Sequence, residues 1–510
     1  MKSSLRTRSF SASTREPDSM TYSPALSPTV SAALERFRPL LSSAEFTRLL
    51  EVLTQDLLPS IRINLLKQDP TQFSRQLHDR YGWDFSPVPY CASGFNLTAP
   101  SGSIAKTIEH ALGDYYIQES ASMLPVELFD LTQHTSPLIL DMAASPGGKT
   151  THLVDKTSDC GLVIANDASS GRIAALRVVL AKWGAINQAV TCLHGEYFGS
   201  QLSETFDAVL LDAPCSMQNL YDTSSHPSRE VSPGEQQSLS NRQFLLLRSA
   251  LQTVKVGGQV VYSTCTLSPE EDEQVVQRIL DAFGSLIRLD DLSAKLPRPA
   301  PALLQDGSYT FSPHMRNAVR LWPHIFGTTG FFSARFTKQA SRILSTDTDA
   351  LRSTSRIDKK NLFSRKDQQR ICDWMKSFYG FDLEAVLQAQ QLCIMESGNA
   401  ILLVPERLFR EFAELPISSF GLNAFKRIPA GFQISHECAA RFGHLFKNGI
   451  AVLDEEQSRS YLERQDIFSF RAGSALVGET LLVKDESGRV LGRAKALKDR
   501  LKNLLPPRLF

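Results

Sequence analysis

Long hydrophobic runs are absent from this 510-residue sequence. None approaches the roughly 18 apolar residues that a membrane-spanning helix needs, so we exclude a transmembrane protein. A strong charge of either sign is also absent, because the formal net charge is +1 at pH 7. A nearly neutral total neither demands nor excludes a nucleic-acid partner, since a local basic face can lie within it.

Paired cysteines are missing as well. The eight cysteines are scattered, and none forms a C-x-x-C pair. This spacing predicts neither a metal site nor a disulfide framework, and it favours thiols that stay reduced in the cytoplasm. The 42% apolar and 21% charged residues are typical of a soluble globular protein, and the length predicts about two to four domains.

The start of the chain has few acidic residues: it is basic and serine-rich, with no acid before Glu16. This composition is compatible with an organelle transit peptide, but we favour a disordered tail over residues 1–25. Residues 28–55 then show the apolar spacing of helices, and residues 60–68 alternate like a strand. These patterns predict a small α/β module over residues 26–100.

The last third of the chain changes in composition twice. Residues 341–360 are polar and rich in serine and threonine, which predicts a linker. Residues 361–425 mix helical and strand patterns, and residues 426–510 predict mainly short strands and turns. Basic residues near the end alternate with apolar ones: Arg489, Arg493, Lys495, Lys498, Arg500, Lys502 and Arg508. A basic run is usually a solvated face, so RNA contact and simple solvation both stay open.

A repeated order of strand, loop and helix occupies residues 137–265. Alternating apolar strands and helices predict an α/β fold, a doubly wound parallel sheet with helices on both faces. The predicted strands are residues 137–144, 161–169, 189–195, 206–214 and 257–266, and the predicted helices include residues 171–184 and 238–254.

A glycine-containing turn, DMAASPGGKTT over residues 141–151, joins the first of these strands to a helix. Such a turn brings backbone N–H groups and a helix N-terminus close to a ligand. A P-loop requires an additional glycine where this chain has Ala143. Asp167, at the end of the second strand, is placed to hold the ribose diol of an adenosine cofactor. We favour the adenosine cofactor and keep a P-loop NTPase as an alternative.

Two cysteines stand at the carboxyl ends of neighbouring predicted strands, where ligands bind in such sheets. Cys215 follows the fourth strand, close to Asp212, and Cys265 ends the fifth. A free cysteine is most often a small buried apolar residue, but here both have polar neighbours. Carbon 5 of cytosine becomes nucleophilic when a thiolate adds to carbon 6 and an acid contacts ring N3. The three side chains could supply these roles for a methyl transfer.

Four stretches of the chain together resemble the Sun/NOL family of RNA (cytosine-5)-methyltransferases. They are GDYYIQESASMLP, DMAASPGGKTTHL, LLDAPCS and GGQVVYSTCTLSPEEDE. The resemblance implies a Rossmann-like methyltransferase domain over residues 101–340 with S-adenosyl-L-methionine as its cofactor. It also implies an N-terminal RNA-binding module and a PUA-like RNA-binding domain over residues 426–510, because the C-terminal end resembles that of the family's bacterial ribosomal RNA enzymes. We expect a monomer whose partner is ribosomal RNA or the small ribosomal subunit.

The same resemblance assigns roles to individual residues. Cys265 would be the nucleophile, Cys215 would help release the product, and Asp212 would contact the target base. The residues implied around the cofactor are Asp141, Ala143, Pro146, Gly147, Gly148, Lys149, Asp167, Arg172 and Asp212.

Three positions depart from the family pattern. His194 precedes Gly195 where many relatives have aspartate, Met217 stands where relatives favour glycine, and Asp272 stands where they have asparagine. These departures keep a non-catalytic RNA-binding or ribosome-assembly factor open as an alternative. A DNA methyltransferase would leave Cys265 without a role.

Overall fold

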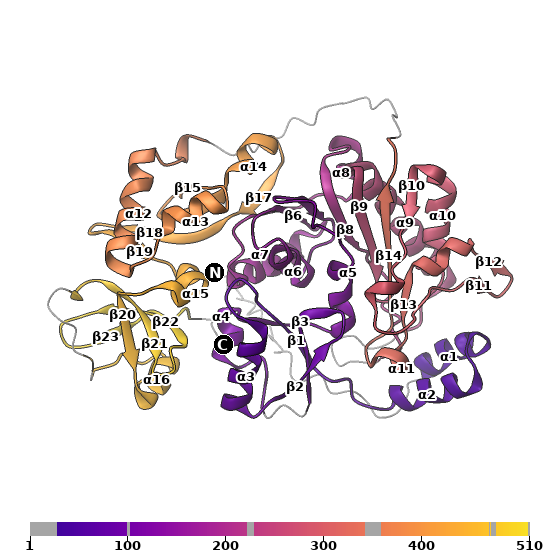
Figure 1. Ribbon diagram of the computed structural model, residues 1–510, viewed down its shortest axis with the longest axis horizontal. Helices are drawn as coiled ribbons and strands as arrows, with labels where there is room; N and C mark the ends of the chain where they lie inside the picture. The colour runs from indigo at the N-terminus through magenta and orange to yellow at the C-terminus, as the bar shows by residue number, and fades with distance from the viewer. Residues whose placement is uncertain are drawn as a thin grey trace, which may run out of the picture.

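The computed structural model describes residues 28–98, 102–221, 229–341, 359–468, 470 and 476–507, and a mixed sheet of nine strands lies at the centre of this part of the chain (Figure 1). The predicted tail over residues 1–25 and nearly all of the predicted linker lie outside the described residues. The strand order is β10-β14-β9-β8-β5-β6-β7-β17, and β13 pairs with β14.

The five middle strands of this sheet run parallel to one another, as the sequence predicts. They are β5 (Leu138–Asp141), β6 (Leu162–Asn166), β7 (Gln188–Thr191), β8 (Phe206–Asp212) and β9 (Val254–Thr264). The strands at the two edges are antiparallel and were not predicted, which makes the sheet mixed rather than purely parallel. They are β10 (Ile287–Leu289), β13 (Val319–Leu321), β14 (Phe331–Lys338) and β17 (Ile417–Phe420).

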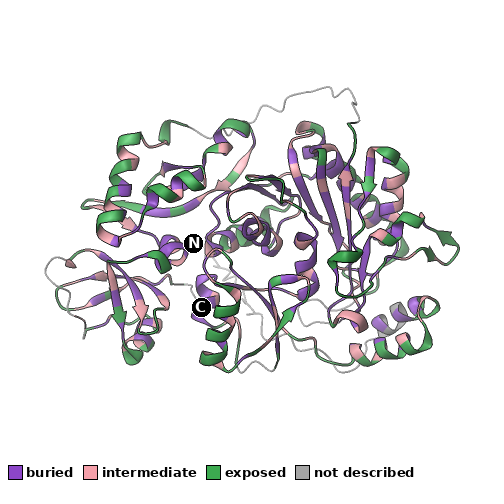
Figure 2. Ribbon diagram, viewed as in Figure 1, coloured by how far each residue is buried: buried purple, intermediate pink, exposed green. Residues whose placement is uncertain are grey.

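Helices pack on both faces of the sheet, whose central strands are largely buried (Figure 2). The alternation of residues along β5 illustrates the two layers. Leu138 and Leu140 pack with α9 and α10 in one core, whereas Ile139 between them packs with α6 and α7 in a second core. No helix within the described ranges is both long and apolar enough to cross a membrane. The helices of this region are α5 (Leu124–Glu127), α6 (Gly148–Lys156), α7 (Ser170–Trp183), α8 (Glu196–Gln201), α9 (Pro233–Thr253), α10 (Glu273–Phe283) and α11 (Pro323–Phe326).

A four-stranded antiparallel sheet, in the order β2-β3-β1-β4, forms the N-terminal part. Its strands are β1 (Ser60–Ile63), β2 (Asp84–Val88), β3 (Cys91–Thr98) and β4 (Tyr115–Ile117). Because β4 pairs with β1, this part continues beyond the predicted boundary at residue 100. Its helices are α1 (Pro28–Phe37), α2 (Ser43–Leu53), α3 (Pro70–Tyr81) and α4 (Ile108–Leu112).

Arg62 of β1 joins this N-terminal sheet to the central one. Its guanidinium is fully buried, pairs with Asp155 at 2.5 Å, and donates to the Gly148 carbonyl at 3.1 Å and to Thr151 Oγ1 at 2.6 Å. It also lies over the ring of Trp183, 4.5 Å from the centroid. The charge of Arg62, which lies in the N-terminal part predicted to bind RNA, therefore joins two parts of the protein and is not exposed to a ligand.

Two smaller sheets form the C-terminal part, at the left of Figure 1. The predicted boundary between residues 425 and 426 falls inside β18, which pairs with both β16 and β19. The first sheet contains β15 (Leu392–Ser397), β16 (Ala400–Pro405), β18 (Leu422–Ile428) and β19 (Gly431–Ile434), with α12 (Arg365–Tyr379), α13 (Leu383–Ala389) and α14 (Glu406–Glu411). The second contains β20 (Ile450–Leu453), β21 (Thr480–Asp485), β22 (Val490–Ala496) and β23 (Leu501–Asn503), and α15 (His436–Phe442) and α16 (Glu455–Leu462) lie in the same stretch of the chain.

Contacts inside the fold engage three of the basic residues near the C-terminus. Arg489 pairs with Asp485 and Glu109, Arg493 donates to a backbone carbonyl, and Arg500 pairs with Asp466. Lys498 and Lys502 remain exposed, and Arg508 lies outside the described residues. Part of the positive charge near the C-terminus is therefore used in contacts within the fold, and less of it is available to a ligand.

Candidate active site

The thiol groups of Cys215 and Cys265 are in contact, as their predicted places at neighbouring strand ends suggest. Strands β8 and β9 are parallel neighbours with Asp212 opposite Ser263, so the residues that follow them emerge side by side. Cys215 Sγ and Cys265 Sγ lie 3.1 Å apart, and both side chains are partly buried. The separation allows one thiol to donate its proton to the other.

Asp212 lies at the end of β8 and has a partner for each oxygen. Oδ1 accepts from the Ser263 hydroxyl at 2.7 Å, and Oδ2 accepts from Lys149 Nζ at 2.7 Å. Lys149 also donates to Ser122 Oγ at 2.8 Å. Burial opposes the charge on Lys149, but the Asp212 carboxylate outweighs it and raises the lysine pKa above its ordinary value. The glycine-containing turn and the thiol pair are therefore linked through one ion pair.

The predicted site residues include neither Ser263 nor Ser122, although the sequence holds a signal for each. Ser263 is one of the polar neighbours of Cys265 and stands two residues before it. Ser122 lies in the upstream stretch GDYYIQESASMLP that resembles the methyltransferase family. Their partners could not be chosen without the register of β8 against β9 and the position of α6.

Cys215 holds its proton more firmly than an ordinary thiol. Its hydrogen bond to Cys265, its burial and the charge of Glu271 all raise the pKa of Cys215 well above the usual value. Cys215 is therefore a protonated thiol at neutral pH and can donate to the sulfur of Cys265.

The turn after β5 has the shape that a cofactor site needs. Gly147 has a φ of +118°, and a Cβ there would lie 3.0 Å from Val179 Cγ1. Only glycine fits this close approach to α7 without strain. Helix α6 begins at Gly148, so its first N–H groups face the turn. Ala143 and Pro146 lie on the same turn.

Two buried acids lie beside this turn. Asp141 ends β5, and its Oδ2 accepts from Thr150 Oγ1 at 2.7 Å, whereas Oδ1 has no partner among the residues that the structure describes. Burial raises the pKa of Asp141 to about 7. Asp167 follows β6 and accepts from the Ser169 N–H at 2.9 Å, while Arg172 Nη2 lies 3.5 Å from its Oδ2. An orphaned buried oxygen and an acid at the second strand end fit a nucleoside cofactor with an amine and a ribose diol.

The structure explains two of the departures from the family pattern. Met217 has a φ of +61°, the left-handed region that glycine adopts at little cost, and its side chain is exposed. Asp272 is fully buried, accepts from Thr264 Oγ1 at 2.5 Å and pairs with Arg320 at 3.3 Å. Burial raises the pKa of Asp272 well above its ordinary value, and Arg320 opposes that shift, so an acid is accommodated at this position. His194 is exposed, and nothing in the described structure explains its presence.

The backbone conformation at Met217 leads to a stability prediction. We expect Met217→Val to lower the free energy of unfolding by about 1–2 kcal/mol, because a β-branched residue is strained at positive φ. Met217→Gly should change it by less than about 1 kcal/mol, since relief of strain offsets the added chain entropy. Urea titration of the three proteins measures the difference, and equal stability of the valine and glycine variants would contradict it.

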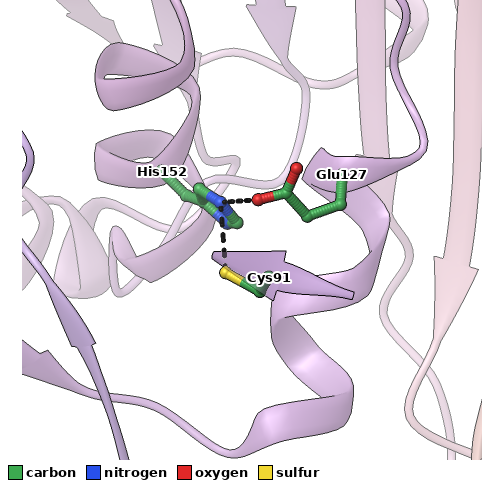
Figure 3. A group of neighbouring side chains, drawn as sticks. All are labelled: Cys91, Glu127 and His152. Atoms are coloured by element: carbon green, nitrogen blue, oxygen red, sulfur yellow. Dashed lines mark hydrogen bonds and ion pairs between the residues drawn. The ribbon is translucent and has the colours of Figure 1, made fainter. Parts of the chain in front are cut away.

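A second polar cluster lies between the N-terminal sheet and α6 (Figure 3). His152 Nε2 is 2.9 Å from Glu127 Oε1 and 3.8 Å from Cys91 Sγ, and the potential ligand atoms of the three residues lie within 4.8 Å of one another. Lys156 already balances the charge of Glu127 at 3.0 Å. Burial raises the pKa of Cys91 to about 11, so the thiol is protonated in the absence of a metal ion. The absence of a metal from the function stays a prediction.

Comparisons with known proteins match most of the chain to ribosomal RNA methyltransferases. Residues 128–337 match the family model described as 16S rRNA methyltransferase RsmB/F, and residues 31–120 match the N-terminal domain of 16S rRNA methyltransferase RsmF. Ribosomal RNA small subunit methyltransferase F of Shewanella loihica is 32% identical over 457 residues, which are 88% of each chain. The Aeromonas salmonicida protein of the same name is 32% identical over 456 residues, covering 88% of this chain and 90% of that one.

Solved structures share the central fold. A methyltransferase homolog protein from Pyrococcus horikoshii is 31% identical, has a TM-score of 0.52, and covers 61% of this chain and 100% of its own. NSun6 from the same organism is 20% identical with a TM-score of 0.51, covering 60% and 98%, and supports the fold alone. These matches confirm the resemblance seen in the sequence motifs and set aside both the P-loop NTPase and the non-catalytic factor. The chain belongs to the RsmB/F family of 16S rRNA methyltransferases and is an S-adenosyl-L-methionine-dependent enzyme.

Proposed function

We propose that this enzyme methylates carbon 5 of a cytosine in 16S ribosomal RNA through a covalent bond from Cys265 to carbon 6. The observation that carries the proposal is the pair of thiols 3.1 Å apart at adjacent strand ends, next to Asp212. A single thiol would suffice for the attack. A second thiol in contact with it fits a reaction that must also break the covalent bond.

The chain's own residues account for each step. Cys265 Sγ adds as a thiolate to carbon 6 of the flipped-out cytosine, while the carboxyl group of Asp212 supplies a proton to ring N3, where negative charge develops. Lys149 and Ser263 hold Asp212 in place for this contact. S-adenosyl-L-methionine, when bound, supplies the methyl group that carbon 5 attacks. Loss of the carbon 5 proton to solvent water then restores the double bond as the carbon–sulfur electrons return to Cys265. N3 returns its proton to Asp212, and the Cys215 thiol assists by donating a hydrogen bond to the departing sulfur.

The cofactor would occupy the turn after β5. Asp167 would hold the ribose diol, and the unpaired oxygen of Asp141 would accept from the cofactor's amine. The other residues proposed to surround it are Ala143, Pro146, Gly147, Gly148, Lys149 and Arg172. Asp212 stands at the same edge, is held there by Ser263 and Lys149, and is proposed to contact both the cofactor and the target base.

The parts outside the central sheet would position the RNA. The N-terminal part and a PUA-like domain around β20 to β23 are the proposed RNA-binding modules, and the exposed Lys498 and Lys502 support the second assignment. We propose that the enzyme acts as a monomer in the cytoplasm, where its eight free thiols would stay reduced.

Bisulfite mapping of ribosomal RNA tests the assignment. A strain lacking the gene is expected to lose 5-methylcytosine at one position of 16S RNA and to regain it when the wild-type gene is returned. The purified enzyme, offered naked 16S RNA and assembled small subunits in parallel, would show which one is the substrate. Unchanged cytosine methylation in the deletion strain would contradict the ribosomal assignment.

A further inference from the structure

A buried carboxylate contacts the turn that carries Cys215. Glu271 is fully buried, and its Oε2 accepts from the backbone N–H of Ser216 at 2.9 Å. The same oxygen accepts from Gln243 Nε2 at 2.9 Å. Gln243, also fully buried on α9, donates to the Pro214 carbonyl at 3.0 Å. The backbone on both sides of Cys215 is therefore held by one pair of side chains.

The backbone of Glu271 is itself fixed, because Tyr262 Oη donates to its carbonyl at 2.5 Å. Its second carboxylate oxygen, Oε1, is buried and has no hydrogen-bond partner within the described part of the chain. Arg320 nearby pairs with Asp272 and Glu273 instead. Burying a carboxylate with an unpaired oxygen is costly, so its position beside a reactive thiol calls for an explanation.

We propose that Glu271, together with Gln243, is a positioning residue that holds Cys215 against Cys265 for the release step. The inference rests on the proposed covalent mechanism. Within the described residues, the hydrogen bonds of Glu271 reach neither Cys265 nor Asp212. The partner of Cys265 is Cys215, and the partners of Asp212 are Ser263 and Lys149. Loss of the carboxylate should thus displace Cys215 and leave the attacking thiol and the base contact in place. The charge of Glu271 also contributes to the raised pKa of Cys215, after the Cys265 hydrogen bond and burial.

Glu271→Leu tests this role, because it keeps the approximate size of the side chain and removes the oxygen that accepts from both Ser216 and Gln243. Glu270→Leu is the matched control: this neighbouring carboxylate instead pairs with Arg36, 2.8 Å away, and accepts from Gln236. Single-turnover methyl transfer to 16S RNA, steady-state turnover, and the fraction of protein in an SDS-resistant RNA adduct are measured for each variant. Gln243→Leu provides a second route to the same loss if Glu271→Leu does not fold.

A displaced release group should slow turnover by about tenfold to a hundredfold in Glu271→Leu, with the single-turnover rate nearly unchanged. The adduct fraction should rise, and Glu270→Leu should resemble the wild type. If Glu271 only supports the fold, its loss would lower both rates together. That result, or no change in either rate, would overturn the inference. If Cys215→Ala forms an adduct but Glu271→Leu does not, this inference alone fails. If the wild type transfers no methyl group to the RNA, the proposed function fails first.

Discussion

Cys265→Ala will abolish methyl transfer, with a loss of roughly 10⁴-fold or more, because carbon 5 of cytosine does not attack a methyl donor until a nucleophile adds to carbon 6. Transfer of radiolabelled methyl groups to 16S RNA measures the effect. Cofactor binding should persist, since the residues proposed for the cofactor lie on the turn after β5 and at the end of β6.

A cysteine away from the thiol pair provides the control. Cys160 is partly exposed in the turn between α6 and β6, where its Sγ donates to the Ser158 carbonyl at 3.4 Å. Cys160→Ala should keep wild-type activity. Full activity of Cys265→Ala would mean that Cys265 is not the nucleophile.

Cys215→Ala will trap the enzyme on its RNA. The attack by Cys265 can still occur, but the group that assists release is gone, so turnover should fall by roughly 10²-fold or more while a covalent adduct accumulates. The adduct is expected as a slow band on a denaturing gel that disappears on nuclease treatment.

The double variant separates this effect from nonspecific crosslinking. Cys215→Ala combined with Cys265→Ala should form no adduct, because the bond requires the Cys265 sulfur. An adduct that survives in the double variant would assign the bond to another residue. Absence of an adduct in the single variant would assign the release step elsewhere.

The central strands could be predicted because their residues are buried on both faces and read as apolar runs. Their order along the chain places Cys215, Cys265 and Asp212 at one edge of the sheet, and the structure brings these three together. Two of the antiparallel strands that were not predicted, β10 and β13, are only three residues long and have no distinctive pattern.

Contacts between side chains that are distant in the sequence could not be predicted from the sequence. Glu271 looks like one acid in an acidic stretch, and only packing against α9 shows that it contacts the Cys215 turn. The basic run stayed ambiguous for a related reason, since the partners of Arg489 and Arg500 are acids that only the fold brings close. Charge in a sequence does not say whether it faces solvent or another side chain.

The buried arginine of the first strand ties the N-terminal part to the catalytic sheet. Arg62 on β1 and Asp155 on α6 are both fully buried, so separating the two parts would break their ion pair and the hydrogen bonds around it. Arg441 makes comparable contacts from the C-terminal side, where it donates to the Leu66 carbonyl and lies 3.8 Å from Asp159. We therefore expect the outer parts to unfold together with the catalytic domain as one cooperative unit. Such a unit would hold the proposed RNA-contacting surfaces at a fixed distance from the thiols.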